Sequence, residues 1–182
     1  MAEIIIFIFS GIFIGIAAGL FGLGGGLMIV PVVTYCLVYF SYTPFDQAII
    51  IGISTSLASM VITGAMAAYA HSKNNNVDRA IIKIFLPGLI IGSLIIGFFI
   101  ESIPGDFLKY FFIFYAFVIA YKLFKHQEAL KKSTFPNRLL SNMISFVFSI
   151  ISGIVGIGGA TLFVPFLIKN NIPPKLAIGT SS

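Results

Sequence analysis

The chain has 182 residues, of which 58% are hydrophobic and only 9% are charged, with a formal net charge of +5. A soluble domain carries about 25% charged residues, so this composition excludes a water-soluble globular protein and indicates an integral membrane protein. The apolar runs are continuous and lack the alternation of a membrane β-barrel, which makes the predicted fold class an all-α polytopic membrane protein. The basic residues lie in short loops between apolar runs, a pattern typical of membrane topology and not of a nucleic-acid surface.

Apolar segments that could form membrane helices follow one another along the whole chain, given that about 20 apolar residues span a bilayer. In order, they are 4–20, 27–40, 47–70, 80–100, 107–124, 139–157, 161–168 and 175–182. The second segment is too short for a full crossing. The N-terminus carries Glu3 and no basic residue, so we interpret 4–20 as a retained first helix and not as a signal peptide.

One glycine-rich segment occurs twice. Residues 19–31 read GLFGLGGGLMIVP and residues 153–165 read GIVGIGGATLFVP. A second match follows in the same order, with GISTS at 52–56 and AIGTS at 177–181. Two ordered matches predict a duplicated unit. The predicted organisation is a first membrane repeat at 1–124, a cytoplasmic loop at 125–138 and the start of a second membrane repeat at 139–182.

The second repeat contains only the beginning of its third segment. A completed pair would hold about three further spans. We therefore expect an incomplete transporter that needs a companion chain, or a homo-oligomer, to complete the second repeat.

The basic residues predict how the helices are oriented. All of them except Lys109 can lie on one side of the membrane, which the positive-inside rule makes the cytoplasmic side. The acidic residues that then lie on the other side are Glu3, Asp46, Glu101 and Asp106.

This arrangement requires the segments 4–20 and 27–40 to enter and leave the membrane on the same side. The second repeat then starts from the opposite side, which is inverted topology. In the alternative, each glycine segment interrupts a single crossing and the repeats are parallel. That alternative leaves Lys169 and Lys175 outside, so inversion is the favoured prediction.

The glycine segments do not fit a nucleotide site. A P-loop has Lys and then Ser or Thr after its last glycine, whereas Leu27 and Met28 follow Gly26. A dinucleotide-binding fingerprint needs a βαβ unit, which is not predicted. In a membrane, clustered glycines either let helices pack closely or break a helix. The density of glycines favours a break, with packing as the alternative.

Two hydroxyl pairs lie beside the repeated glycines, Thr55-Ser56 in the first repeat and Thr180-Ser181 in the second. Such hydroxyls either bond back to their own helix or line a site, and the sequence leaves both readings open. No carboxylate lies inside a predicted span, and no metal-ligand or nucleophile–base spacing occurs. We therefore predict no enzyme activity, no metal and no cofactor.

The glycine and hydroxyl motifs resemble those of the sulfite exporter (TauE/SafE) family. The resemblance covers nearly the whole chain and implies a multi-pass permease of the inner membrane, built from inverted repeats, that moves sulfite, sulfonates or related small anions. Its implied partners are the lipid bilayer and a small anion, with no nucleic acid. The predicted substrate-binding residues are Gly22, Gly24, Gly25, Thr55, Ser56, Gly156, Gly158, Gly159, Thr180 and Ser181.

We expect the helices that follow the two glycine breaks to present their N-termini to an anion near the membrane midplane. A helix N-terminus carries about half a positive charge and binds anions without a buried Lys or Arg. The alternatives are a non-transporting membrane scaffold or subunit, an inactive fragment of a split transporter, and a channel.

Overall fold

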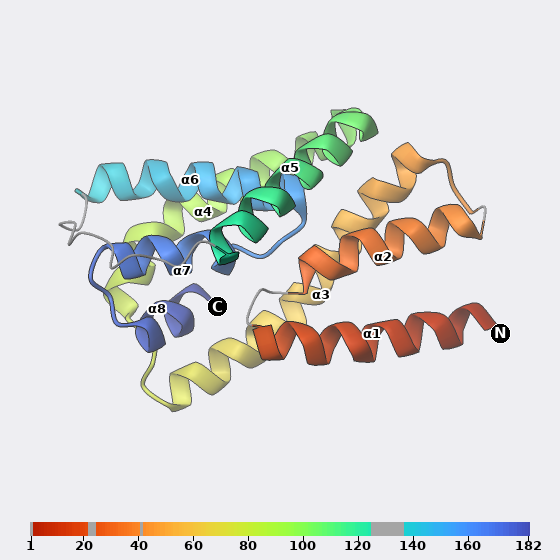
Figure 1. Ribbon diagram of the computed structural model, residues 1–182. Coiled ribbons are helices and arrows are strands. Elements are labelled where there is room, and N and C mark those ends of the chain that lie inside the picture. Colours follow the sequence, from red (N-terminus) through yellow and green to blue (C-terminus); the bar gives the residue numbers. More distant parts are fainter. Residues whose placement is uncertain (1, 22–24, 41, 125–136) are drawn as a thin grey trace.

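Within residues 2–21, 25–40, 42–124 and 137–182, which the computed structural model describes, all regular structure is helical. The α-helices are α1 (Ala2–Phe21), α2 (Gly26–Tyr39), α3 (Phe45–Lys73), α4 (Arg79–Phe99), α5 (Gly105–Phe124), α6 (Arg138–Val155), α7 (Ala160–Lys169) and α8 (Pro174–Ser181). A short 3-10 helix, η1 (Ile100–Ser102), follows α4 directly. The predicted all-helical fold class is confirmed for these residues (Figure 1).

Three stretches of the described residues are long and apolar enough to cross a membrane. They are α3, Arg79–Ser102 and α6, with mean hydropathies of 1.8, 2.3 and 1.7. The helices α2 and α7, which follow the two glycine segments, are apolar but shorter. That the segments after the glycines do not make full crossings stays a prediction, with which these shorter lengths agree.

Helix α3 extends further than the apolar pattern predicted. The expected span 47–70 is contained in a helix that continues through the polar residues His71 and Lys73. Hydropathy marks where a membrane ends, and a helix whose backbone hydrogen bonds are internal can continue beyond that point into water. The chain then turns at Asn75, which has φ 55°, and Asp78 caps α4 by accepting hydrogen bonds from the backbone of its first turn.

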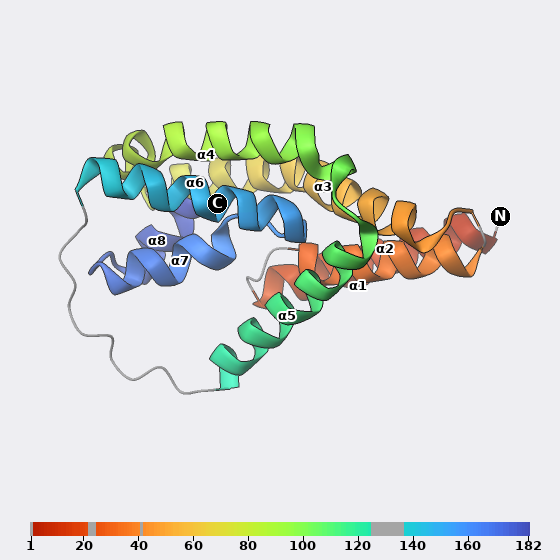
Figure 2. The same cartoon turned by 90° about the horizontal axis from the view of Figure 1, so that it is seen from above.

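The helices α1 and α2 form one hairpin, and α6 and α7 form another. Figures 1 and 2 show α1 running from one end of the molecule to its middle, and α2 running back toward the same end. From the opposite end, α6 runs to the middle and α7 returns. The first residues of α2 and the turn after α6 therefore lie in the middle of the molecule, with the long helix α3 beside them.

Small residues let α4 and α6 pack closely. A Cβ on Gly88 would overlap the Ser145 hydroxyl, and a Cβ on Gly92 would lie 2.9 Å from the Ser149 Cβ. The Ser149 hydroxyl donates a hydrogen bond of 2.9 Å to the carbonyl oxygen of Leu89 on the facing helix. Small residues and interhelical hydroxyl bonds of this kind are what hold helices together where lipid removes the hydrophobic driving force.

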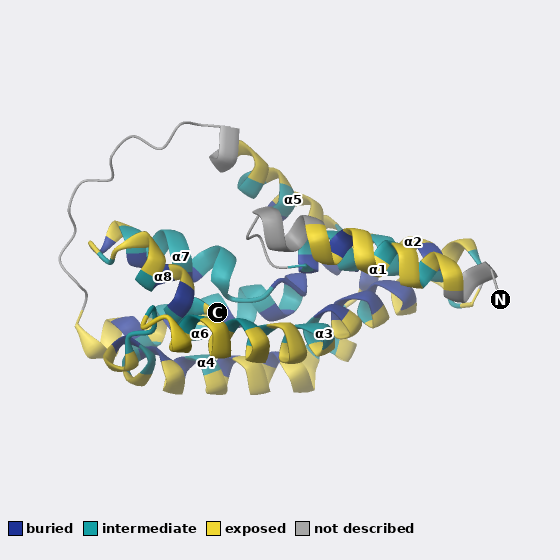
Figure 3. Ribbon diagram, turned by 90° about the horizontal axis from the view of Figure 1, so that it is seen from below, coloured by how far each residue is buried: buried dark blue, intermediate teal, exposed yellow. Residues whose placement is uncertain are grey.

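The outer faces of the helices are apolar and exposed (Figure 3). Phe98 is 81% exposed, Tyr69 74% and Phe13 72%. In water such a surface would be a large unpartnered apolar area, whereas in a bilayer it contacts lipid. The protein is therefore a multi-pass membrane protein.

Candidate functional site

The second glycine segment ends α6 with a left-handed residue. Gly156 has φ +71°, a conformation that side chains other than glycine rarely adopt. Its N–H bonds the Ser152 carbonyl oxygen at 2.9 Å, which satisfies an acceptor at the end of the helix. Helix α7 begins four residues later at Ala160, after Gly158 and Gly159. The glycines here break the helix, as the sequence predicted.

The two glycine segments are in contact. A Cβ on Gly26 would overlap the carbonyl oxygen of Gly156 and lie 2.8 Å from the Ile157 Cα. Gly25 closes the first turn of α2, and its carbonyl oxygen accepts hydrogen bonds from Met28 and Ile29. Gly22 and Gly24 lie outside the described residues. Close backbone approach therefore explains why the position before Leu27 is glycine.

Ser56 joins the second glycine segment to α3. Its hydroxyl donates a hydrogen bond of 2.6 Å to the Gly156 carbonyl oxygen, and its side chain is fully buried. The next turn of α3 adds Met60, whose sulfur lies 3.0 Å from the position of a Cβ on Gly158 and whose methyl lies 2.8 Å from that of a Cβ on Gly26. Met60 thus contacts both glycine segments.

The other predicted hydroxyls are placed differently. Thr55 is exposed on α3, one residue from Ser56. The Thr180 hydroxyl accepts a hydrogen bond of 2.9 Å from the Asp78 backbone N–H, in the loop between α3 and α4. The Ser181 hydroxyl bonds the Ala177 carbonyl oxygen of its own helix at 2.8 Å. The structure therefore brings Ser56 to the glycine segments and sets Thr180 against the loop that follows α3.

The position of Gly179 explains one difference between the repeats. Its first-repeat counterpart is Ser54, and a Cβ on Gly179 would overlap the Asn76 carbonyl oxygen. Ser54 is exposed on α3 and meets no such constraint. The requirement for glycine here thus comes from loop packing.

A hydroxyl pair that the repeat did not reveal lies at the start of α7. Tyr115, on α5, and Thr161 are 3.1 Å apart between their hydroxyl oxygens, and the Thr161 hydroxyl donates to the Gly158 carbonyl oxygen at 3.3 Å. Thr161 has no polar counterpart in the first repeat, where Leu27 stands, so the duplication gave no signal for it. An aromatic residue in an apolar run gave no signal for Tyr115 either.

No group of three or more His, Cys, Asp or Glu side chains that could hold a metal ion occurs in the described part of the chain. What surrounds the described glycines is instead backbone, apolar side chains such as Met60 and Ile53, and hydroxyls. The arrangement defines a class: a polytopic helical membrane protein in which two glycine-linked helical hairpins meet in the interior.

The chain belongs to the TauE/SafE sulfite exporter family. The family profile, described as sulfite exporter TauE/SafE, matches residues 7–182. This is a family of transporters and not of enzymes. The family resemblance inferred from the motifs is therefore confirmed.

Three relatives are named as "probable membrane transporter" proteins. The one from Haemophilus influenzae is 32% identical over 98% of this chain and 68% of its own length. A protein of Methanocaldococcus jannaschii is 28% identical over 96% of this chain and 65% of its own length. YunE of Bacillus subtilis is 27% identical over 98% of this chain and 72% of its own length. The chain thus spans about two thirds of the length of these relatives, and no solved structure matches it.

Proposed function

We propose that the protein is a permease that moves small anions such as sulfite, sulfonates or related sulfur or organic anions across the inner membrane. Family membership and the relatives' names support a transporter. The observation that carries the proposal is the contact of the two glycine segments, with Gly26 against Gly156 and the Ser56 hydroxyl on the Gly156 carbonyl oxygen.

The anion site of this proposal is built from helix N-termini. The first turn of a helix leaves N–H groups without intrahelical acceptors, and the helix dipole adds positive potential there. Helices α2 and α7 both begin at the glycine segments, so both N-termini lie in the middle of the molecule. In this proposal an anion approaches the backbone at Gly158 and Gly159, where the atoms nearest to an added Cβ belong to the side chains of Met60 and Phe163. The predicted roles of Gly22, Gly24, Gly25, Thr55, Thr180 and Ser181 are part of this proposal.

We also propose that the two repeats have inverted topology with basic loops in the cytoplasm. The opposed directions of the two hairpins support inversion (Figure 2). A second support is the contact between the loop after α3 and helix α8, where the Asp78 N–H bonds Thr180. That contact puts the basic loop residues Lys73 and Arg79 at the same end as Lys175. Parallel repeats would put Lys175 on the other side.

In this account transport follows the alternating access of inverted-repeat carriers, in which one repeat rocks against the other around a fixed site. The glycine segments are one of the places where the repeats touch, beside the packing of α4 on α6, and in this proposal the contact of the glycine segments changes during the cycle. In this movement the N-termini of the short helices α2 and α7 stay next to the anion and stabilise its charge. No charged side chain has to enter the membrane.

Flux in proteoliposomes tests the proposal against its alternatives. The purified protein is reconstituted and the uptake of radiolabelled sulfite is measured over a range of concentrations, with empty liposomes as the control. A permease gives saturable uptake that other small anions compete with. Uptake that does not saturate would indicate a channel, and no uptake above the control would indicate a scaffold or an inactive fragment. A companion chain or a second copy that completes the second repeat stays a prediction, which the mass of the purified complex tests.

A further inference from the structure

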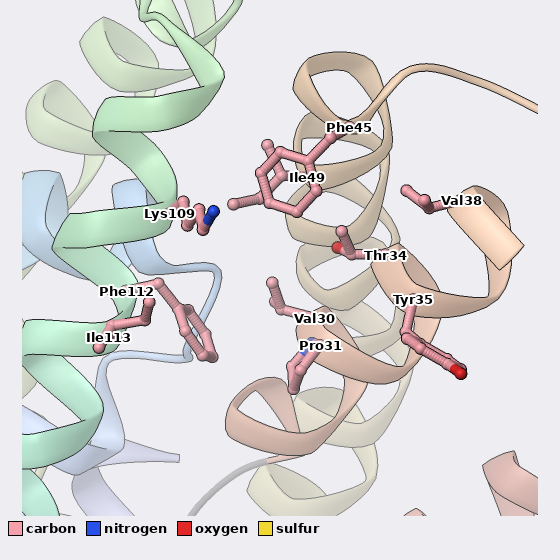
Figure 4. Close-up of a pocket in the computed structure, with 10 residues that line it drawn as sticks. All are labelled: Val30, Pro31, Thr34, Tyr35, Val38, Phe45, Ile49, Lys109, Phe112 and Ile113. Atoms are coloured by element: carbon pink, nitrogen blue, oxygen red, sulfur yellow. The ribbon is translucent and has the colours of Figure 1, made fainter.

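A cavity of about 320 Å³ lies between α2, α3 and α5, and its size is at the lower end of the range for ligand pockets, about 300–1,000 Å³. Its wall is almost entirely apolar, including Val30, Pro31 and Phe112. One charged side chain lines it, Lys109 (Figure 4). Thr34 and Tyr35 also line it, and a cavity that is mostly apolar with a small number of polar or charged groups has the usual composition of a small-molecule site.

Lys109 is the one basic residue that the predicted membrane orientation does not place on the cytoplasmic side. Its position in the cavity suggests a role in binding. Its Nζ lies 5.1 Å from the centroid of the Phe45 ring and 5.6 Å from that of Tyr110. In Figure 4 the amine points toward Phe45 and Ile49 across the cavity. No ion pair of Lys109 is present among the described residues, so these aromatic contacts leave its charge without a carboxylate partner.

The acidic residues at this end of the molecule belong to a different pocket. Asp46, Glu101 and Asp106 line a neighbouring recess that includes Pro104. None of them lines the cavity of Lys109. The charge inside the cavity is therefore positive, although the surface beside it is acidic.

The inner wall of the cavity adjoins the glycine segments. Val30 lines the cavity, and its Cγ2 lies 3.0 Å from the position of a Cβ on Gly156. One side chain thus separates the cavity from the turn that ends α6. A ligand in the cavity would therefore lie next to the proposed anion site, separated from it by the Val30 side chain.

We propose that this cavity binds a soluble organic anion with a small apolar body, its charged group at Lys109 and its apolar part against Phe112 and Val30. A cation on an apolar wall complements an anionic group attached to hydrocarbon, whereas a bare, strongly hydrated ion would lose its water here without replacement. If the protein is the proposed permease, this cavity is also the place where an anion enters on its way to the glycine segments, and that role rests on the proposed function. The binding of an organic anion in the cavity does not depend on the proposed function.

Binding of benzenesulfonate by the purified protein in phosphatidylcholine nanodiscs tests the site. We expect Lys109→Gln to weaken binding about tenfold, which corresponds to about 1.4 kcal/mol, and Lys109→Arg to change it by less than about threefold, because the charge is kept. Lys83→Gln is the matched control, since Lys83 is exposed on α4 and does not line the cavity. Benzyl alcohol, the neutral probe, should bind the wild type and Lys109→Gln equally. Unchanged benzenesulfonate affinity in Lys109→Gln would overturn the proposal.

An anionic lipid headgroup has the same chemistry, and a second arm separates the two sources. Binding is repeated in nanodiscs that contain phosphatidylglycerol. Benzenesulfonate binding that persists supports a soluble ligand, and its loss would overturn the proposal in favour of a lipid. Benzenesulfonate binding that depends on Lys109, without sulfite flux, would contradict the proposed function but support this binding site. Sulfite flux together with benzenesulfonate binding that does not depend on Lys109 would support the proposed function but contradict this binding site.

Discussion

The Ser56 hydroxyl donates a hydrogen bond of 2.6 Å to the Gly156 carbonyl oxygen, across 100 positions of the sequence. Ser56 belongs to the hydroxyl motif of the first repeat and Gly156 to the glycine motif of the second. Two of the motifs on which the predicted duplication rests are therefore bonded to each other. This contact holds α3 against the turn that ends α6.

Removal of this hydroxyl should destabilise the protein. Ser56→Ala leaves the buried Gly156 carbonyl oxygen without that hydrogen bond, and an unsatisfied buried group costs about 1–3 kcal/mol. We expect a lower thermal unfolding midpoint in detergent. Ser59→Ala is the control, because the Ser59 hydroxyl bonds the Ser56 carbonyl oxygen within its own helix. Equal midpoints for the two variants would contradict the role of the contact.

The contact of the glycine segments predicts a second difference. An alanine at Gly26 has no space, because its Cβ would overlap the Gly156 carbonyl oxygen, and overpacking against backbone costs at least about 2 kcal/mol. Gly97→Ala is the control, since nothing lies within 4 Å of a Cβ there, and alanine favours the helix by up to about 1 kcal/mol. The thermal unfolding midpoint should therefore fall in Gly26→Ala and stay equal or rise in Gly97→Ala. A Gly26→Ala protein as stable as the wild type would rule out the close approach of Gly26 to the Gly156 backbone.

Much of this fold could be predicted from the sequence, because long apolar runs specify membrane helices and a repeated glycine cluster specifies a repeated break. The residues at which the helices end were harder to predict from the sequence. The apolar pattern ended at residue 70, but α3 continues through Lys73 because polar side chains in water do not end a helix. Both hydroxyl pairs had the same sequence signal, yet Ser56 bonds Gly156 and Thr180 bonds Asp78. Only the packing of segments distant in sequence decides which partner each hydroxyl has.

The orientation of the loops gives a third prediction. Single cysteines at Asn75 and Ile103, in a chain whose buried Cys36 is replaced by alanine, are labelled with a membrane-impermeant maleimide in intact cells. We expect labelling at residue 103 only, because the basic loop that contains Asn75 faces the cytoplasm. The same labelling of both positions would contradict the proposed topology.

The two threonines should separate transport from stability. Thr180→Val removes the acceptor of the Asp78 N–H, so we expect a loss of about 1 kcal/mol in stability. Thr55 is exposed, and Thr55→Val removes a proposed donor to the anion with little change in volume. We expect the second variant to unfold like the wild type and to show weaker anion uptake. Uptake equal to the wild type would remove Thr55 from the proposed site.

Sulfite uptake by Gly158→Leu tests the central claim most directly. The closest atom to a Cβ at this position is the Met60 sulfur, at 3.0 Å, so a larger side chain requires the flexible Met60 side chain to shift, and it would lie beside the N-terminus of α7. The account predicts at least about a tenfold loss of sulfite uptake in proteoliposomes, equivalent to about 1.4 kcal/mol, with the unfolding midpoint of the wild type and with full uptake in the control Gly97→Leu. Wild-type uptake by a well-folded Gly158→Leu protein would contradict an anion site at the glycine segments.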